Sequence, residues 1–231
     1  MNDMQVKPQS SMTVTNNKQL LDLYRANSRV GAENIEVAIP RMTIQATGKS
    51  SKNILLNGQE ATDGYFYYKP TRSQTNTIDC HVLTISKGFR ADGWNDRKDV
   101  FNQILAAVAL VDGKKLPFIM YFTGKKLQNL WNFAEEVSMY TKSAGLPIPM
   151  FALKVRLTTK KEVSPKGSSW VVCFEILKEE DGSPVLITDP NEFVSIKNQV
   201  ESIKNGIDEL VAAKSTGDVL PSDEIPTNDT F

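Results

Sequence analysis

The sequence predicts an α+β protein: a small β-barrel or curled antiparallel sheet with an inserted helix and a long C-terminal helix. Several short β-like runs follow one another between residues 64 and 177, with turn signals between them. A helical apolar pattern interrupts these runs near 124–143, and another begins after Asp189. The 231 residues suffice for one or two domains with a sizeable core. Close-spaced strands with helices added at intervals favour a curled sheet over a parallel one.

Composition divides the chain into four segments. Residues 1–17 are polar without a hydrophobic period, which predicts a disordered arm. Residues 18–189 form the predicted β-rich domain, which opens with a short helix near 17–28. Residues 190–214 form a C-terminal amphipathic helix, and 215–231 form an acidic tail that we expect to be disordered.

The predicted strands follow from β-branched and aromatic runs that end at Gly, Pro or Asp. Asp112-Gly113 is a hairpin signal between two apolar runs, and residues 160–169 are expected to form a loop between the last two strands. The runs are 35–45, 64–70, 77–86, 104–111, 116–122, 151–159 and 170–177.

Both longer helices have recognisable ends. Thr123 can cap the helix near 124–143, and Gly145 with Pro147 ends it. Asp189-Pro190-Asn191-Glu192 is a strong helix start, with an acidic N-cap and Pro at the first position. The helix that follows carries apolar residues at spacings of three and four, which fits either packing on its own sheet or a homodimer seam. These residues are Phe193, Ile196, Val200, Ile203, Ile207 and Leu210.

Several classes of protein are disfavoured. Residues 1–18 contain no apolar signal-peptide core, and the longest apolar run, 104–111, is the size of a strand rather than a membrane span. Cys80 and Cys173 provide no disulfide framework, which is typical of a reducing compartment. We therefore expect a cytoplasmic protein that does not enter a membrane.

The residues needed for common catalytic sites are scarce. His81 is the single histidine and lies within a strand pattern, and the two cysteines are too few for a zinc site. Residues 43–50 end in Gly-Lys-Ser, but Thr43 stands where a phosphate-binding loop needs Gly. Asp92, Asp96 and Asp99 lack the Gly and closing Glu of a calcium loop. The sequence predicts no catalytic residue, metal or cofactor.

The formal net charge of zero conceals a marked segregation of charge. Residues 1–63 carry +1, 64–167 carry +8, 168–214 carry −5 and 215–231 carry −4. The basic region also contains aromatic residues between its cations. A line of cations suits phosphates, and exposed rings suit unpaired bases, so this mixture predicts binding to single-stranded nucleic acid.

The candidate nucleic-acid-binding residues are chosen as cations and neighbouring rings of this basic region. We expect Phe66, Tyr68, Trp170 and Phe174 to be core rings instead. The candidates are Tyr65, Tyr67, Lys69, Arg72, Lys87, Phe89, Arg90, Trp94, Lys125, Lys126, Lys154, Arg156, Lys160 and Lys161, with Lys160, Lys161 and Lys166 in the predicted loop.

The C-terminal tail is acidic and ends in an aromatic residue. A mobile polyanion can compete with nucleic acid for a cationic groove, and a terminal Phe can dock in a partner's apolar pocket. The candidate partner-binding residues are Asp223, Glu224, Ile225, Pro226, Asp229 and Phe231.

A strand-rich body followed by a helix and an acidic tail ending in Phe resembles the single-stranded DNA-binding proteins of bacteria and their phages. Asp223-Glu224-Ile225-Pro226 is similar to the acid-acid-Ile-Pro part of the bacterial tail, although four residues separate Pro226 from Phe231. The resemblance implies an OB-like body, single-stranded DNA as ligand, and replication or recombination proteins as partners of the tail. The body pattern around Ile39-Pro40-Arg41, Gly64–Tyr67, Leu146-Pro147 and 151–157 also resembles phage replication-region proteins.

The sequence therefore predicts a sequence-independent, non-enzymatic single-stranded DNA-binding protein of phage type. The alternative is a phage inhibitor or assembly factor that acts through the 190–214 helix. A metal-dependent enzyme acting on nucleic acid is a third possibility.

Overall fold

The computed structural model describes residues 40–46, 52–92, 98–111, 114–143, 148–165 and 167–215. The predicted arm 1–17, the predicted helix near 17–28 and tail residues 216–231 lie outside the described residues. All of the described residues belong to one compact unit.

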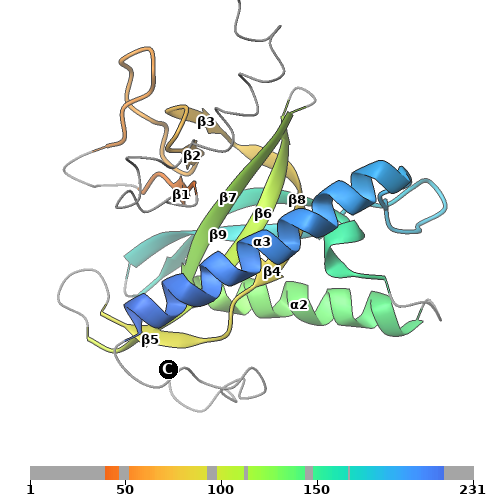
Figure 1. Ribbon diagram of the computed structural model, residues 1–231. Coiled ribbons are helices and arrows are strands. Elements are labelled where there is room, and N and C mark those ends of the chain that lie inside the picture. Colours follow the sequence, from red (N-terminus) through yellow and green to blue (C-terminus); the bar gives the residue numbers. More distant parts are fainter. Residues whose placement is uncertain are drawn as a thin grey trace, which may run out of the picture. The chain divides into compact units, whose positions relative to one another are not determined.

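Nine strands, two α-helices and one short 3₁₀ helix make up this part of the chain (Figure 1). In chain order they are β1 Met42–Ile44, β2 Phe66–Tyr68, β3 Ser73–Thr75, β4 Thr77–Ile85, β5 Phe89–Ala91, β6 Val100–Val111, β7 Lys114–Thr123, α2 Lys125–Ser143, η2 Met150–Ala152, β8 Lys154–Ser164, β9 Gly167–Ile176 and α3 Pro190–Lys214. The predicted α+β class, with an inserted helix and a long C-terminal helix, is confirmed.

The strands form a three-stranded sheet and a six-stranded sheet, and within each sheet the named strands pair antiparallel. In the larger sheet, one edge of β6 pairs with β7. The other edge of β6 pairs with β5 near its start and with β4 further along. Next to β4 lies β8, and next to β8 lies β9. No pairing among the described strands joins β7 to β9, so this part of the chain forms open sheets rather than a closed barrel.

The two hairpins of the large sheet are those the sequence predicts, with one correction. Val111 pairs with Lys114 across the predicted Asp112-Gly113 turn. The final hairpin is longer than predicted, because β8 continues to Ser164 and pairs with β9 from its start at Gly167. Lys160 and Lys161 therefore lie on a strand opposite Val171 and Trp170, and not in a loop.

The long strand β6 is buried on both faces because a helix covers each one. Leu105, Ala107 and Ala109 belong to the core that contains Leu127, Leu130, Phe133 and Val137 of α2. Ile104, Ala106 and Val108 belong to the second core, with Ile196, Ile207 and Val211 of α3. Successive strand residues point to opposite faces, which explains why this segment reads as a continuous apolar run rather than an alternating one.

Helix α3 packs on its own sheet, which was one of the two interpretations open from the sequence. Asp189 caps the helix, and its Oδ1 accepts a hydrogen bond of 2.9 Å from the Asn191 backbone N–H. The six residues that would form a dimer seam face the sheet instead. Ile196 and Ile207 are buried, Val200, Ile203 and Leu210 pack beside them, and the Phe193 ring lies 5.1 Å from that of Phe151.

The small sheet β1–β3 is joined to the large sheet through the core and through backbone contacts. Met42, Phe66 and Tyr68 belong to the core under α2. The Ile119 N–H donates to the Pro40 carbonyl at 2.8 Å, and β3 leads directly into β4 through Asn76. Among the described residues, no helix is long and apolar enough to cross a membrane.

Candidate nucleic-acid interface

Strand β8 carries the densest group of predicted cations. Lys154, Arg156 and Lys160 share the face opposite the core residues Val155 and Leu157, since their numbers have the same parity. At about 3.3 Å per residue, Lys160 lies about 20 Å from Lys154 along the strand. The core under α3 contains no described residue of β8 or β9. The cations of β8 therefore lie on a part of the sheet beyond the apolar contacts of α3.

Arg156 is held in position by an aspartate that no sequence motif indicates. Its Nε and Nη2 donate to the two carboxylate oxygens of Asp79 at 2.8 and 3.0 Å. This bidentate bond lowers the pKa of the Asp79 carboxyl and raises that of Arg156, and the nearby charge of Lys154 also lowers the Asp79 pKa. A guanidinium has five N–H donors, so the pair leaves donors on Arg156 for another acceptor.

A second group of predicted cations lies at the end of the sheet where α2 begins. Asn102 of β6 pairs with Phe89 of β5 on one side and with Thr123, just before α2, on the other. This pairing brings β5 and the start of α2 to the same end of the sheet. Exposed Lys87 and Arg90 lie at β5, and Lys125 with Lys126 lies in the first turn of α2. Arg90 Nη1 is 3.0 Å from the Asp99 carboxylate.

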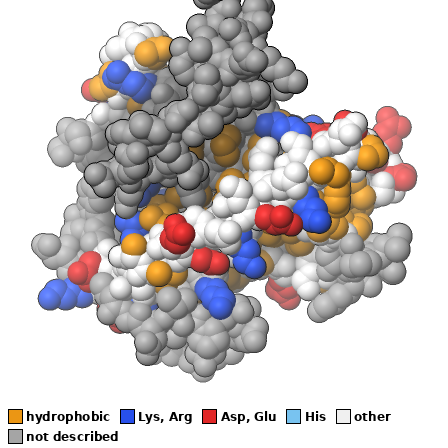
Figure 2. Space-filling view, in the orientation of Figure 1, with side chains coloured by type: hydrophobic (Ala, Val, Ile, Leu, Met, Phe, Trp, Pro, Cys, Tyr) orange, Lys and Arg blue, Asp and Glu red, His pale blue; other side chains and the backbone are white. Residues whose placement is uncertain are grey.

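The remaining predicted cations, Lys69 and Arg72, lie in the exposed turn between β2 and β3. Arg72 has a positive φ of 50°, and its Nε donates to the Ile54 carbonyl at 3.2 Å. The predicted cations therefore form three groups on separate elements, of which the β8 group is the most linear. Over α3, Lys197 and Lys204 are interspersed with Glu201 and Asp208, and Figure 2 shows basic and acidic side chains mixed on this face.

The structure corrects the selection of aromatic residues. Phe89 is 1% exposed in the core under α3, and Tyr67 is 6% exposed, with its hydroxyl donating to the Ile54 carbonyl at 3.0 Å. Neither ring is available to stack on a base, contrary to the prediction. All three residues of β2 are buried because residues from 55 to 61 cover the face opposite the main core. Tyr65 is half-buried, and Trp94 lies outside the described residues.

The rings assigned to the core follow the prediction in part. Phe66 and Tyr68 are buried. Phe174 is half-buried and stacks on Phe133 with ring centroids 4.7 Å apart, and Trp170 is half-buried beside Gly64.

A cluster of cations and one ring at β7 was missed by sequence reasoning. Arg41 Cζ lies 5.2 Å from the centroid of the Tyr121 ring, and Lys214 Nζ lies 6.0 Å from it. Burial raises the pKa of the Tyr121 hydroxyl, which has no hydrogen-bond partner among the described residues. Three elements far apart in sequence meet here, so neither spacing nor local composition could have indicated the cluster.

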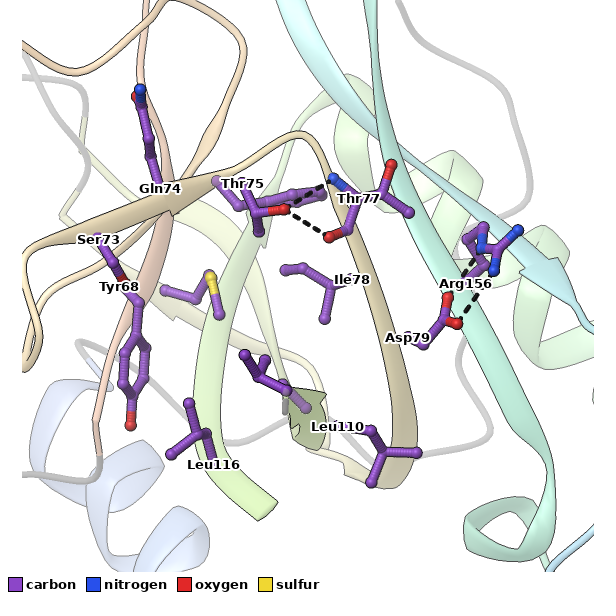
Figure 3. Close-up of a pocket in the computed structure, with 14 residues that line it drawn as sticks. Tyr68, Ser73, Gln74, Thr75, Thr77, Ile78, Asp79, Leu110, Leu116 and Arg156 are labelled. Carbon is purple, nitrogen blue, oxygen red and sulfur yellow. Dashed lines mark hydrogen bonds and ion pairs between the residues drawn. The ribbon is translucent and has the colours of Figure 1, made fainter. Parts of the chain in front are cut away.

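A pocket opens between the small sheet and the large sheet (Figure 3). Its volume is about 460 Å³. Met42, Phe66, Ile78 and Ala109 provide an apolar, buried part of its lining, and Thr75, Thr77, Asp79 and Arg156 provide polar groups.

His81 and Cys80, two side chains that can take part in catalysis, are both buried in the core. His81 is buried, and its Nδ1 donates to the Leu153 carbonyl at 3.1 Å, because a carbonyl oxygen can only accept. Burial lowers the pKa of His81 and raises that of the Cys80 thiol. Within the described ranges, no group of three or more His, Cys, Asp or Glu residues could hold a metal ion. Residues 47–50 of the Gly-Lys-Ser segment and Asp96 lie outside those ranges, as do Lys166 and the candidate tail residues 223–231.

Comparisons with protein families, with curated proteins and with solved structures find no match to this chain.

Proposed function

We propose that this protein binds single-stranded DNA through its phosphates, largely without sequence preference, in DNA replication or recombination of phage type. The observation that carries this proposal is the line of cations on β8. Lys154, Arg156 and Lys160 share one face of a regular strand, and Lys161 is exposed on the other face. Asp79, Glu162 and Glu175 lie on the same face as the three cations. Cations spaced along one face of a strand offer positive charges to a row of phosphates.

The preference for a single strand follows from what surrounds the cations. A duplex reader usually presents a basic helix to the major groove, whereas the exposed surface of α3 mixes both signs of charge. The cations of β8 lie on a sheet next to a partly apolar pocket, which suits a flexible strand with unpaired bases. The OB-like character of the body is part of the same proposal. An antiparallel sheet with α2 inserted between β7 and β8 supports it.

Because Phe89 and Tyr67 are buried, base stacking should contribute less to the binding free energy than the sequence predicts. Each base stacked on an aromatic ring contributes about 1–3 kcal/mol. With these rings buried, a larger share of the affinity falls to phosphate contacts. Binding should accordingly weaken steeply as salt increases, since phosphate contacts release counterions.

The acidic tail completes the proposal as a regulatory and partner-binding segment. We propose that Asp223–Pro226, Asp229 and Phe231 recruit replication or recombination proteins in the cytoplasm, and that the tail competes with DNA for the cations. The alternative of an interaction protein acting through α3 has less support, because the apolar residues of this helix face its own sheet.

A fluorescence-anisotropy titration with labelled oligo(dT) at low salt tests the proposal. Binding at micromolar protein or below is expected, with weaker binding to a duplex of the same length. Absence of binding to oligo(dT) at micromolar protein would contradict the proposed function.

A further inference from the structure

We infer that a patch beside the small sheet contacts an unpaired base of the DNA strand and its phosphate. This inference rests on the proposed function and adds a second DNA-binding site to it. This small-sheet patch consists of Ile54 and Leu56 in the hairpin of residues 53–61, and of Lys69 and Arg72 in the turn between β2 and β3. Figure 2 shows hydrophobic and basic side chains next to one another at the end of the molecule that carries the small sheet.

The apolar side chains of the small-sheet patch are accessible. Leu56 is 79% exposed and Ile54 is 38% exposed, whereas Leu55 between them is 8% exposed. Leu55 packs with Tyr67 and anchors the hairpin on β2, so Leu56 is presented to solvent. Leu and Ile side chains pack against unstacked bases in nucleic-acid complexes, and a duplex must be kinked before its bases offer such a face. The small-sheet patch therefore favours a single strand over a duplex.

Hydrogen bonds hold the apolar and basic parts of the small-sheet patch together. The Leu56 backbone N–H donates to the Arg72 carbonyl at 3.0 Å. In the other direction, Arg72 Nε donates to the Ile54 carbonyl at 3.2 Å, and the Tyr67 hydroxyl donates to the same carbonyl at 3.0 Å. The hairpin and the turn are thus fixed to one another before a ligand binds, which lowers the entropic cost of binding.

The two cations of the small-sheet patch are available to a phosphate. No ion pair among the described residues involves Lys69 or Arg72. Arg72 uses its Nε for a backbone carbonyl, so the donors of its two Nη atoms remain for another acceptor. Glu60, opposite Ile54 in the hairpin, pairs with Lys52 at 3.4 Å between carboxylate and Nζ. The positive charge beside Leu56 is therefore not neutralised by an ion pair with a described carboxylate.

Continuity with the large sheet favours DNA over an acidic protein segment as the occupant. Lys161 is exposed and shares a face of β8 with Thr159, whose hydroxyl donates to the Gly64 carbonyl at 2.5 Å. Trp170 pairs with Lys161 across the hairpin, and its indole lies against Gly64. The cation-bearing end of the β8–β9 hairpin thus meets the segment that leads into β2. A DNA strand bound at Lys161 can continue onto the small sheet and reach the patch.

The test removes the apolar contact with Leu56→Ala and a phosphate contact with Lys69→Gln. Both residues are exposed, and Lys69 makes no described side-chain bond. The matched controls on α3 are Val194→Ala, at a residue 54% exposed, and Lys204→Gln, at an exposed lysine. Each variant and the wild type are titrated with oligo(dT) and with an abasic oligomer of equal length. Circular dichroism melting checks that each variant is folded.

Leu56→Ala should weaken oligo(dT) binding about fivefold, because an aliphatic contact with one base is lost, and should leave abasic binding unchanged. Lys69→Gln should weaken binding to both oligomers and make the slope of log K against log salt shallower by about 0.7. The α3 controls should change neither. If Leu56→Ala binds oligo(dT) like the wild type, or loses affinity for both oligomers equally, the inference is wrong while the proposed function stands.

Two further outcomes separate the inference from its alternatives. A synthetic acidic peptide of residues 218–231 that binds the wild type but not Leu56→Ala, with DNA affinity unchanged, would assign the small-sheet patch to a protein partner and overturn the inference. A wild type that binds neither oligomer would contradict the proposed function itself.

Hydrogen–deuterium exchange of the wild type provides a result that does not depend on any variant. Amides of residues 54–58 and 69–72 should exchange more slowly when oligo(dT) is bound. Protection confined to other segments of the chain would contradict the inference.

Discussion

Gly64 is a residue at which both the backbone and the neighbouring side chains require glycine. Its φ is +83°, and a Cβ at this position would lie 2.6 Å from the Trp170 indole. Gly58 has nearly the same φ, +82°, but a Cβ there would have no neighbouring atom within 4 Å. Comparing the cost of substituting Gly58 with that of substituting Gly64 therefore separates backbone strain from steric overlap.

Replacing Gly58 by Ala should cost about 1 kcal/mol, because an L-residue is strained in a left-handed backbone. Replacing Gly64 by Ala should cost about 1–3 kcal/mol more, because the indole must move. Urea denaturation of both variants measures the difference in the free energy of unfolding. Equal losses for the two variants would show that the Trp170 contact is unimportant.

His81 makes the stability of the protein depend on pH. Burial lowers its pKa from the ordinary value of 6.5, against the opposing effects of the Leu153 hydrogen bond and the Glu192 charge, while Lys115 and Lys154 lower it further. Between the folded-state pKa and 6.5 the unfolded chain binds a proton that the folded chain does not. The stability due to neutral His81 is therefore complete above this range and decreases as the pH falls through it.

The melting temperature of the wild type should accordingly decrease between about pH 7 and about pH 5. His81→Asn removes the titrating group and should weaken this dependence, although the smaller side chain will lower stability at every pH. Thermal melts of both proteins across this range provide the measurement. The prediction fails if the variant loses as much stability on acidification as the wild type.

At the scale of elements, α3 is stabilised by the apolar face that packs against the sheet. Ile207 is 1% exposed in the core under α3, whereas Val194 on the same helix is 54% exposed. This difference favours packing on the sheet as the interpretation of the apolar stripe, because a helix that packs on its own sheet depends on Ile207 without a second copy of the chain.

Ile207→Ala should destabilise the protein by about 2–5 kcal/mol, and Val194→Ala by less than about 1 kcal/mol. The free energy of unfolding should not depend on protein concentration for either variant. Chemical denaturation at several protein concentrations, with sedimentation velocity as a check, measures both quantities. A stability that rises with concentration and is lost in Ile207→Ala would favour the dimer seam instead.

Local patterns were sufficient to predict most elements but few of the contacts between them. The Asp189 cap, the apolar spacing of α3 and the Asp112-Gly113 hairpin signal each act over a few residues, and each predicted its element. β8 extends through Lys160 and Lys161 because these residues pair with β9. The Lys and Gly residues of this segment indicated a loop instead, since local composition contains no information about the partner strand.

The candidate site was harder to predict because burial and partners depend on tertiary packing. Phe89 and Tyr67 have cationic neighbours in sequence, but the α3 core and residues 55–61 bury them. Asp79 lies 77 positions from Arg156, so their ion pair follows from the β4–β8 register rather than from any motif.

At the scale of the whole molecule, the zero net charge is the sum of a basic central region and an acidic C-terminal region. Residues 64–167 carry +8, and residues 168–231 carry −9. Opposite charges of this size on one chain can screen one another, and salt reduces this effect.

Deleting residues 218–231 should therefore tighten binding to oligo(dT) at low salt, because the tail no longer competes for the cations. The gain should diminish at high salt, and binding to a partner that recognises the tail should be lost. Anisotropy titrations of the full chain and the truncated chain measure the effect. Unchanged DNA affinity after truncation would count against competition by the tail.

The salt dependence of oligo(dT) binding tests the central claim most directly, in Lys154→Gln/Lys160→Gln and in a control pair on α3, Lys197→Gln/Lys204→Gln. Both double variants remove the same charge; Lys154 is half-buried, and the other three lysines are exposed. If the β8 lysines contact phosphates, the slope of log K against log salt should become shallower by about 1.4 in the β8 variant, at about 0.7 per contact, and remain unchanged in the α3 variant. Identical slopes in the wild type and both variants would contradict phosphate binding along β8.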